Sequence, residues 1–104
     1  MIIYGIKTCD TCRKALKKLD NAVLHDVRSD GFPPDLLDRA LAAFGKDLLN
    51  TRSTTWRGLG ESDRERPVLA LIRDHPTLMK RPLIDAGGTL YLGWGVDVQK
   101  ALGV

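Results

Sequence analysis

The sequence predicts an α/β fold in which helices cover a mixed four-stranded sheet, formed by one domain over residues 1–104. Three observations predict this fold class. The chain begins with a strand, a helix and a second strand, which is the order of a right-handed parallel unit. Two β-rich segments around a Gly-Gly pair near the end predict an antiparallel hairpin. Between these parts, at about residues 33–80, the apolar spacing predicts an all-helical insertion.

The parallel unit is predicted from the first 27 residues. Residues 2–4 are β-branched or aromatic and read as a short buried strand that Gly5 closes. A helix from about residue 10 to 19 is predicted by apolar side chains at spacings i, i+3, i+4 and i+7, which are Cys12, Ala15, Leu16 and Leu19. Residues 23–27 then predict the second strand.

The middle of the chain reads as helical. Prolines at positions 33 and 34 suit the opening turn of a second helix, and Gly45 suits its C-cap. A short helical turn is expected at residues 46–49, and a polar loop or helix start follows at residues 50–56. A third helix is predicted from about Arg66 to Asp74, where a His-Pro pair stops it.

The last part returns to strands. Residues 83–86 and 89–92 flank Gly87-Gly88 and predict a hairpin with a primed turn. Apolar residues at positions 98, 101 and 102 predict a short final helix. The complete order is β-α-β, helical insertion, β-β-α, which is thioredoxin-like architecture.

Composition and charge narrow the functional classes. With 43% hydrophobic and 28% charged residues, the chain is predicted to be globular, and no apolar run approaches the ~20 residues that cross a bilayer. The N-terminus lacks the pattern of a signal peptide, so a cytoplasmic protein is expected. The net charge of +3 is concentrated in residues 7–18, without aromatic residues beside it. This pattern argues against direct binding of nucleic acid.

Cys9 and Cys12 are the only cysteines, and three kinds of site compete for them. A structural disulfide is disfavoured in a reducing cytoplasm, and so short a loop removes little entropy from the unfolded chain. A zinc site needs two more ligands, and the spacings of His25 and His75 match no compact finger, so no metal is expected. Redox-active thiol chemistry fits best, because the pair lies between a strand and a helix.

The predicted placement assigns different roles to the two thiols. Cys9 is predicted to lie on the loop that leads to the helix N-terminus. There, unpaired backbone N–H groups and the positive end of the helix dipole favour a thiolate. Lys7 and Arg13 add positive charge nearby. Cys12 lies on the apolar face, where it is the candidate to resolve a mixed disulfide on Cys9. The alternative is that Cys12 is a small core residue.

Three blocks of sequence resemble the arsenate reductase/Spx/YffB family. They are IYGIKTCDTCRKA at residues 3–15, LNTRSTTW at residues 49–56 and HPTLMKRPLI at residues 75–84. The first two blocks are most similar to the small YffB-type members, which are uncharacterised or proposed glutathione-dependent thiol reductases. The resemblance covers nearly the whole chain and implies the same thioredoxin-like fold.

The resemblance carries over residue by residue. Cys9 matches the nucleophilic cysteine of the family, and Cys12 matches the second cysteine of Spx-type redox switches. Arg81 matches an arginine expected to face the nucleophile, and Pro82 matches a cis-proline beside it. Arg52 is similar to the arginine of the Spx and YffB loop.

Substrate binding is assigned to a small set of residues around the nucleophile. Guanidinium groups would hold a thiolate or an anionic substrate such as the carboxylates of glutathione. The predicted substrate-binding residues are Lys7, Thr8, Arg52, Arg81 and Pro82. Two further arginines that arsenate reductases use fall at Asn50 and Leu92, which disfavours arsenate reduction.

The sequence therefore predicts a cytoplasmic thiol–disulfide reductase acting on a small or protein disulfide. No bound cofactor is expected, and glutathione is the expected co-substrate. A redox-switched regulator that binds the α subunit of RNA polymerase, as Spx does, is one alternative, and an arsenate reductase is another.

Overall fold

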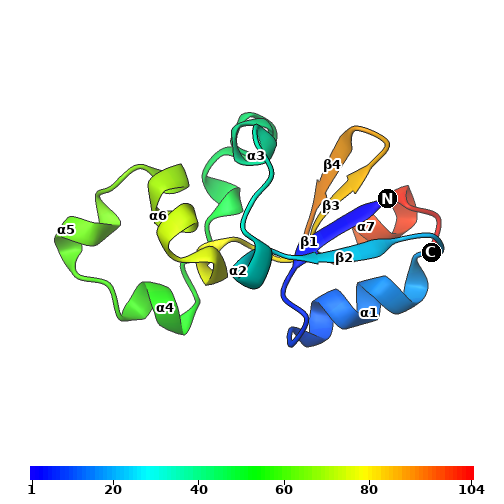
Figure 1. Cartoon of the computed structure of the whole chain (residues 1–104), viewed down its shortest axis with the longest axis horizontal. Helices are drawn as coiled ribbons and strands as arrows, with labels where there is room; N and C mark the ends of the chain where they lie inside the picture. The colour runs from blue at the N-terminus through cyan, green and yellow to red at the C-terminus, as the bar shows by residue number, and fades with distance from the viewer. The chain divides into compact units, whose positions relative to one another are not determined.

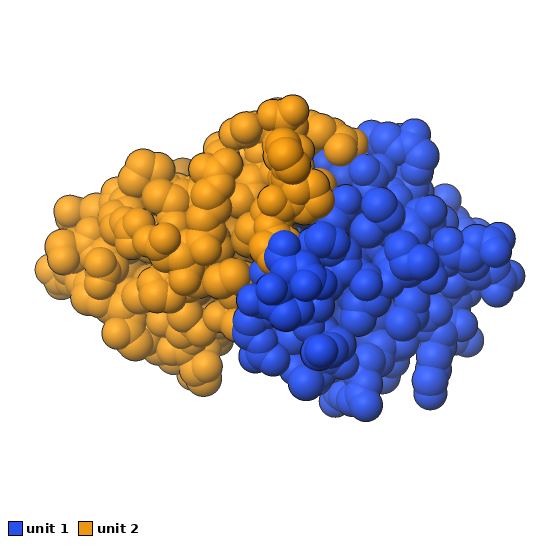
Figure 2. Space-filling view, in the orientation of Figure 1, with its two compact units in different colours: residues 1–30, 81–104 blue, residues 31–80 orange.

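The computed structural model describes residues 1–104, and the chain divides into two compact units (Figure 2). The first unit consists of residues 1–30 and 81–104, and the second consists of residues 31–80. The second unit occupies the stretch in which the sequence predicts a helical insertion. None of the helices is long and apolar enough to cross a membrane.

The first unit contains a four-stranded mixed sheet, which confirms the predicted fold class (Figure 1). Its strands are β1 (Ile2–Gly5), β2 (Val23–Asp26), β3 (Leu83–Ala86) and β4 (Thr89–Leu92). The strand order is β2-β1-β3-β4, with β1 and β2 parallel and the other two pairs antiparallel. The C-terminal end of β1 and the N-terminal end of β3 therefore lie side by side at one end of the sheet, because neighbouring antiparallel strands run in opposite directions.

Helices α1 (Asp10–Lys18) and α7 (Val96–Ala101) pack against one face of this sheet. Ile3 and Ile84 are partners in the β1–β3 register, so their side chains lie on the same face. Both belong to a buried cluster with residues of α1 and its C-cap, and partly buried side chains from the region of α7 pack against it. Ala15, Leu19, Trp94, Val98 and Leu102 contribute to this packing. Helix α1 therefore lies where the apolar spacing predicted it, with its apolar face against the sheet.

The β3–β4 hairpin has the turn that its sequence predicts. Gly87 and Gly88 have φ angles of +63° and +98°, which side chains rarely tolerate. The carboxylate of Asp85 accepts a hydrogen bond from the Gly88 N–H at 2.8 Å and closes the turn. The Gly-Gly pair is therefore required by the backbone conformation.

The second unit is helical, with a small core of its own. Its α-helices are α3 (Leu36–Phe44), α4 (Thr54–Arg57), α5 (Glu61–Arg64) and α6 (Val68–Asp74), and its 3₁₀ helices are η1 (Gly45–Leu48) and η2 (Pro76–Leu78). Fully or almost fully buried side chains include Leu36, Leu37, Leu48, Leu71, Ile72 and Met79. The Asn50 N–H donates to the Leu78 carbonyl, and the Lys80 N–H donates to the Leu48 carbonyl. These bonds join two distant segments of the unit.

Three predicted boundaries are wrong for local reasons. Val27 was expected to end β2, but it begins the short helix α2 (Val27–Asp30), because the side chain of Asp26 caps the backbone N–H groups that follow. Pro33 and Pro34 precede α3, whose N-cap is Asp35. Helix α6 begins two residues later than predicted, after Pro67 at its N-cap.

Candidate active site

Cys9 lies at the junction of a strand and a helix, where the sequence places it. It is the N-cap residue of α1, with extended backbone angles of φ −82° and ψ 120°. Its N–H donates to the Ile6 carbonyl at 2.9 Å, which closes the turn between β1 and α1, and its own carbonyl accepts from the Arg13 N–H. The side chain is partly buried, and the thiol is free. The sulfur therefore lies at the start of the helix and remains accessible.

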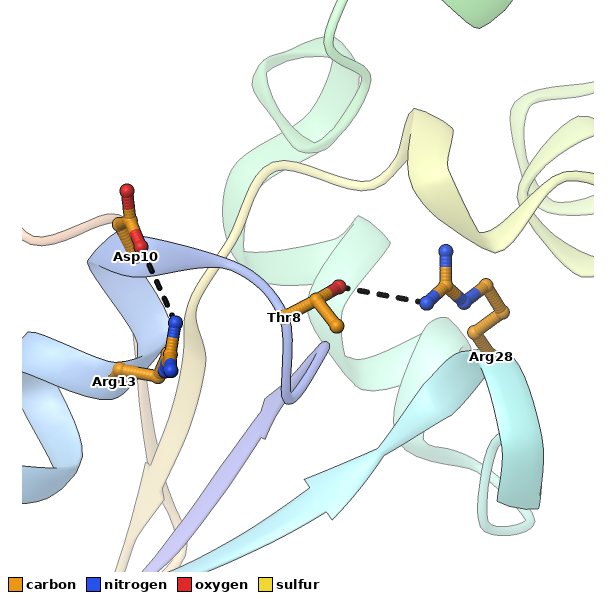
Figure 3. Close-up of polar contacts among 4 residues, drawn as sticks. All are labelled: Thr8, Asp10, Arg13 and Arg28. Carbon is orange, nitrogen blue, oxygen red and sulfur yellow. Dashed lines mark hydrogen bonds and ion pairs between the residues drawn. The ribbon is translucent and has the colours of Figure 1, made fainter.

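The surroundings of Cys9 favour its thiolate. Burial raises the pKa of Cys9, but polar interactions with the backbone N–H and the thiol of Cys12 and with the Arg81 guanidinium outweigh it, and the net pKa lies below the ordinary value. The sulfur forms no capping hydrogen bond of standard geometry. Arg81 provides the cationic partner here, whereas Arg13 pairs with Asp10 at 3.5 Å (Figure 3).

Cys12 has the opposite environment. It is fully buried, and a Cβ atom added to Gly5 would lie only 2.4 Å from its sulfur. Burial and the neighbouring Cys9 sulfur raise the pKa of Cys12 to about 11, although the Ile6 N–H acts in the other direction. At neutral pH Cys12 is a protonated thiol, and it faces the Cys9 sulfur.

Alkylation of the folded protein is expected to separate the two thiols. At neutral pH iodoacetamide should modify Cys9 at least about a hundredfold faster than Cys12, because two units of pKa change the thiolate fraction by that factor. Peptide mass spectrometry after limited labelling measures the ratio, and labelling in denaturant, where both react, is the control. Equal modification of both cysteines in the folded state would contradict this assignment.

Arg81 and Pro82 lie directly before β3, at the end of the sheet where β1 also ends. The Arg81–Pro82 peptide bond is cis, as the family resemblance implies. Pro82 is buried, and its carbonyl accepts a hydrogen bond from the Gly93 N–H at 2.8 Å. Arg81 is partly buried, with its Nε atom inside the protein and its guanidinium acting on the Cys9 sulfur. The β1–β3 pairing thus brings residues that are 72 positions apart to one site.

The other predicted binding residues are distributed over both units. Lys7 and Thr8 lie on the loop before Cys9 and are exposed. The Thr8 hydroxyl accepts a hydrogen bond from the Arg28 guanidinium at 3.4 Å (Figure 3). Arg52 belongs to the second unit, where its side chain is exposed and its N–H donates to the Asn50 side chain at 3.1 Å. A role for Arg52 in binding substrate stays a prediction.

Sequence reasoning missed Asp26 and Arg28. Asp26 ends β2 directly beside Gly5 in the parallel register, and Arg28 follows two residues later, with its guanidinium close to the loop that carries Cys9. The available signal was topological, because functional groups of parallel strands gather at their carboxyl ends. The chain holds no cluster of three or more histidine, cysteine or acidic side chains that suits a metal ion, at this site or at any other.

The fold is thioredoxin-like, as the mixed sheet and its strand order show. Its candidate site is a thiol site, with a free cysteine at the N-terminus of α1 and a cis-proline before β3. Residues 4–101 match the ArsC family, and the chain belongs to this family. Membership indicates thiol-based oxidoreductase chemistry in general.

Individual relatives agree with this family. An uncharacterised protein of Haemophilus influenzae is 44% identical over 101 residues, which cover 88% of this chain and 89% of the relative. A solved structure named as a YffB protein is 32% identical, with a TM-score of 0.87 over 97% of this chain and 96% of the other. A protein of Brucella melitensis described as related to arsenate reductase is 33% identical, with a TM-score of 0.71 over 96% of this chain and 91% of the other.

Proposed function

We propose that this protein is a cytoplasmic thiol–disulfide reductase that uses glutathione as its co-substrate. The observation that carries the proposal is the position of the Cys9 sulfur, at the start of α1 and facing both the Cys12 thiol and the Arg81 guanidinium. A helix N-terminus and a cation together stabilise the thiolate, which is the attacking form of a cysteine. Cys9 is the nucleophile of the reaction.

The reaction is a pair of thiol–disulfide exchanges. The Cys9 thiolate attacks the glutathione sulfur of a mixed disulfide, a new bond forms between the two sulfurs, and the substrate leaves as a thiolate. A second glutathione thiolate then attacks the glutathione sulfur bound to Cys9. Oxidised glutathione is released, and the Cys9 thiolate is regenerated. One disulfide is reduced and one molecule of oxidised glutathione is formed in each cycle.

Cys12 offers a second route for the resolving step. In the free enzyme the Cys9 sulfur raises the pKa of Cys12. Once the Cys9 sulfur belongs to a mixed disulfide, its negative charge is gone, so the pKa of Cys12 falls. The Cys12 thiolate can then attack Cys9, which releases glutathione and leaves a Cys9–Cys12 disulfide for two further glutathiones to reduce.

Positive charge around the loop favours an anionic substrate. Arg81 acts on the nucleophile, and Arg28 lies beside Thr8, the residue before Cys9. A surface depression of about 260 Å³ over α1 is lined by three basic side chains and Asp10. Guanidinium and ammonium groups bind carboxylates, and glutathione carries two of them.

Glutathione-dependent reduction of hydroxyethyl disulfide and of a glutathionylated peptide tests the proposal. Wild-type protein should turn over both, with release of oxidised glutathione. A Cys12→Ser variant that keeps turnover assigns the resolving step to glutathione, whereas a variant that accumulates the Cys9 mixed disulfide assigns it to Cys12. Wild-type protein that reduces neither substrate contradicts the proposed function.

A redox-switched regulator is the second candidate, because the Cys12 thiol lies against Cys9 and the pair can form a disulfide switch. Its partner would be the α subunit of RNA polymerase. If immobilised α subunit retains the protein and oxidation changes this retention, the result would favour this function. A reductase without a regulatory role is expected not to be retained. Arsenate-dependent oxidation of glutathione and glutaredoxin tests the third candidate, an arsenate reductase.

A further inference from the structure

Asp26 is the one charged side chain of the chain that is buried, with 7% of its surface exposed. Burial of a carboxylate is unfavourable unless hydrogen bonds compensate for the lost water. Three backbone N–H groups supply them here. Oδ1 accepts from Arg28 at 2.9 Å and from Ser29 at 3.1 Å, and Oδ2 accepts from Lys7 at 3.0 Å.

The two oxygens serve different parts of the fold. The bonds to Arg28 and Ser29 cap the first turn of α2, as an aspartate at an N-cap normally does. The bond to Lys7 is not needed for capping. It connects the end of β2 to a loop 19 residues earlier in the chain, the loop that leads to Cys9. This bond therefore needs an explanation of its own.

The bond to Lys7 fixes the position of a whole peptide unit. The Lys7 N–H and the Ile6 carbonyl belong to the same planar group, which cannot bend between them. Asp26 holds the N–H end, and the carbonyl end accepts the hydrogen bond from the Cys9 N–H at 2.9 Å. A negative charge at the N–H end also polarises the peptide and strengthens its carbonyl as an acceptor. Asp26 is thus linked to the nucleophile through one rigid group.

Arg28 provides a second connection between the same corner and the loop. Its N–H donates to Asp26, and its guanidinium donates to the Thr8 hydroxyl at 3.4 Å. Lys7 and Thr8 are consequently both held from the end of β2. Figure 3 shows the guanidinium directed at Thr8 from the segment that follows β2.

We propose that Asp26 is a positioning residue for Cys9. Its carboxylate fixes the Ile6–Lys7 peptide, and this peptide keeps the Cys9 sulfur at the start of α1, facing the Cys12 N–H and the Arg81 guanidinium. The inference rests on the proposed function, in which Cys9 is the nucleophile.

Asp26→Asn tests the role with little change in shape. The asparagine carbonyl is expected to turn toward the two N–H groups of α2, so the cap is kept. Its NH₂ group then faces the Lys7 N–H, donor against donor, and the bond to the loop is lost. The pH midpoint of Cys9 alkylation by iodoacetamide should rise by about one unit, which lowers the rate about tenfold below both midpoints.

The sign of the shift separates positioning from a simple charge effect. Loss of a nearby negative charge by itself favours the thiolate and would lower the midpoint. Loss of positioning moves the sulfur away from its donors and raises the midpoint. A lowered or unchanged midpoint in Asp26→Asn, with the low midpoint of the wild-type protein intact, overturns the inference and leaves the proposed function standing.

Matched variants separate positioning from stability. Val27→Ala removes buried methyl groups beside Asp26 and keeps all three of its hydrogen bonds, so it should lower the melting temperature without moving the midpoint. An equal shift in both variants overturns the inference.

If Asp26→Asn does not fold, Asp26→Ser replaces it. Serine retains an N-cap acceptor but has no second oxygen for the Lys7 N–H, so the same rise of the alkylation midpoint is expected. An ordinary midpoint of about 8.5 in the wild-type protein contradicts the proposed function itself.

Discussion

Replacement of Cys9 by serine is expected to lower the proposed glutathione-dependent reductase turnover by on the order of 10³-fold or more, because it removes the proposed nucleophile. A serine hydroxyl is not ionised at neutral pH and does not form a bond to sulfur in an exchange reaction. The interactions that stabilise a thiolate at the start of α1 then have no charge to act on. Turnover with hydroxyethyl disulfide and glutathione measures the loss.

The matched control for Cys9→Ser is Cys12→Ser. Cys12 is buried and protonated, and a serine hydroxyl can donate to the Cys9 sulfur as the Cys12 thiol does, so the first exchange and the alkylation of Cys9 should be nearly unchanged. A single-turnover experiment with a glutathionylated peptide follows the first exchange alone. If Cys9→Ser retains more than about a tenth of wild-type turnover, another group carries the reaction, and the assignment of the nucleophile is wrong.

Gly5→Ala is expected to destabilise the protein by about 1–3 kcal/mol through overpacking. The added Cβ would lie 2.4 Å from the Cys12 sulfur and 3.2 Å from the Cys12 Cβ. Neither Gly5 nor Cys12 can move easily. Gly5 belongs to β1, which is paired with a strand on each side, and Cys12 belongs to α1. Urea denaturation measures the change in the free energy of unfolding.

A double variant identifies the cause of this destabilisation. Cys12→Ala removes the sulfur that the new methyl group meets, so Gly5→Ala should cost less in that background than in the wild-type protein. Gly58→Ala is the control, because its Cβ would meet only ordinary contacts of 3.6 Å, and its effect should stay within about 0.5 kcal/mol. Additive effects of Gly5→Ala and Cys12→Ala would show that the close approach is not the reason.

Local patterns were sufficient to predict the strand, helix and strand that carry the thiol. The apolar spacing located α1 to within a residue at its C-terminus, and the position of Cys9 followed from it. The Gly-Gly pair predicted the hairpin because its backbone angles suit few other residues. In each case the residues that determine the structure are neighbours in the sequence.

Non-local contacts explain what the sequence did not reveal. The role of Asp26 depends on a hydrogen bond to Lys7, and periodicity contains no information about such a bond. Val27 reads as a strand residue by propensity, but the cap formed by the preceding side chain starts a helix. Helix α5 is only four residues long and has no buried side chain, so it has no apolar period to detect.

The pairing of Tyr4 with Leu83 has a consequence for the protein during its synthesis. Both cysteines leave the ribosome long before Arg81 does, and β1 has no β3 to pair with at that stage. A nascent chain that ends before Arg81 therefore lacks the guanidinium that helps to lower the pKa of Cys9 in the folded protein.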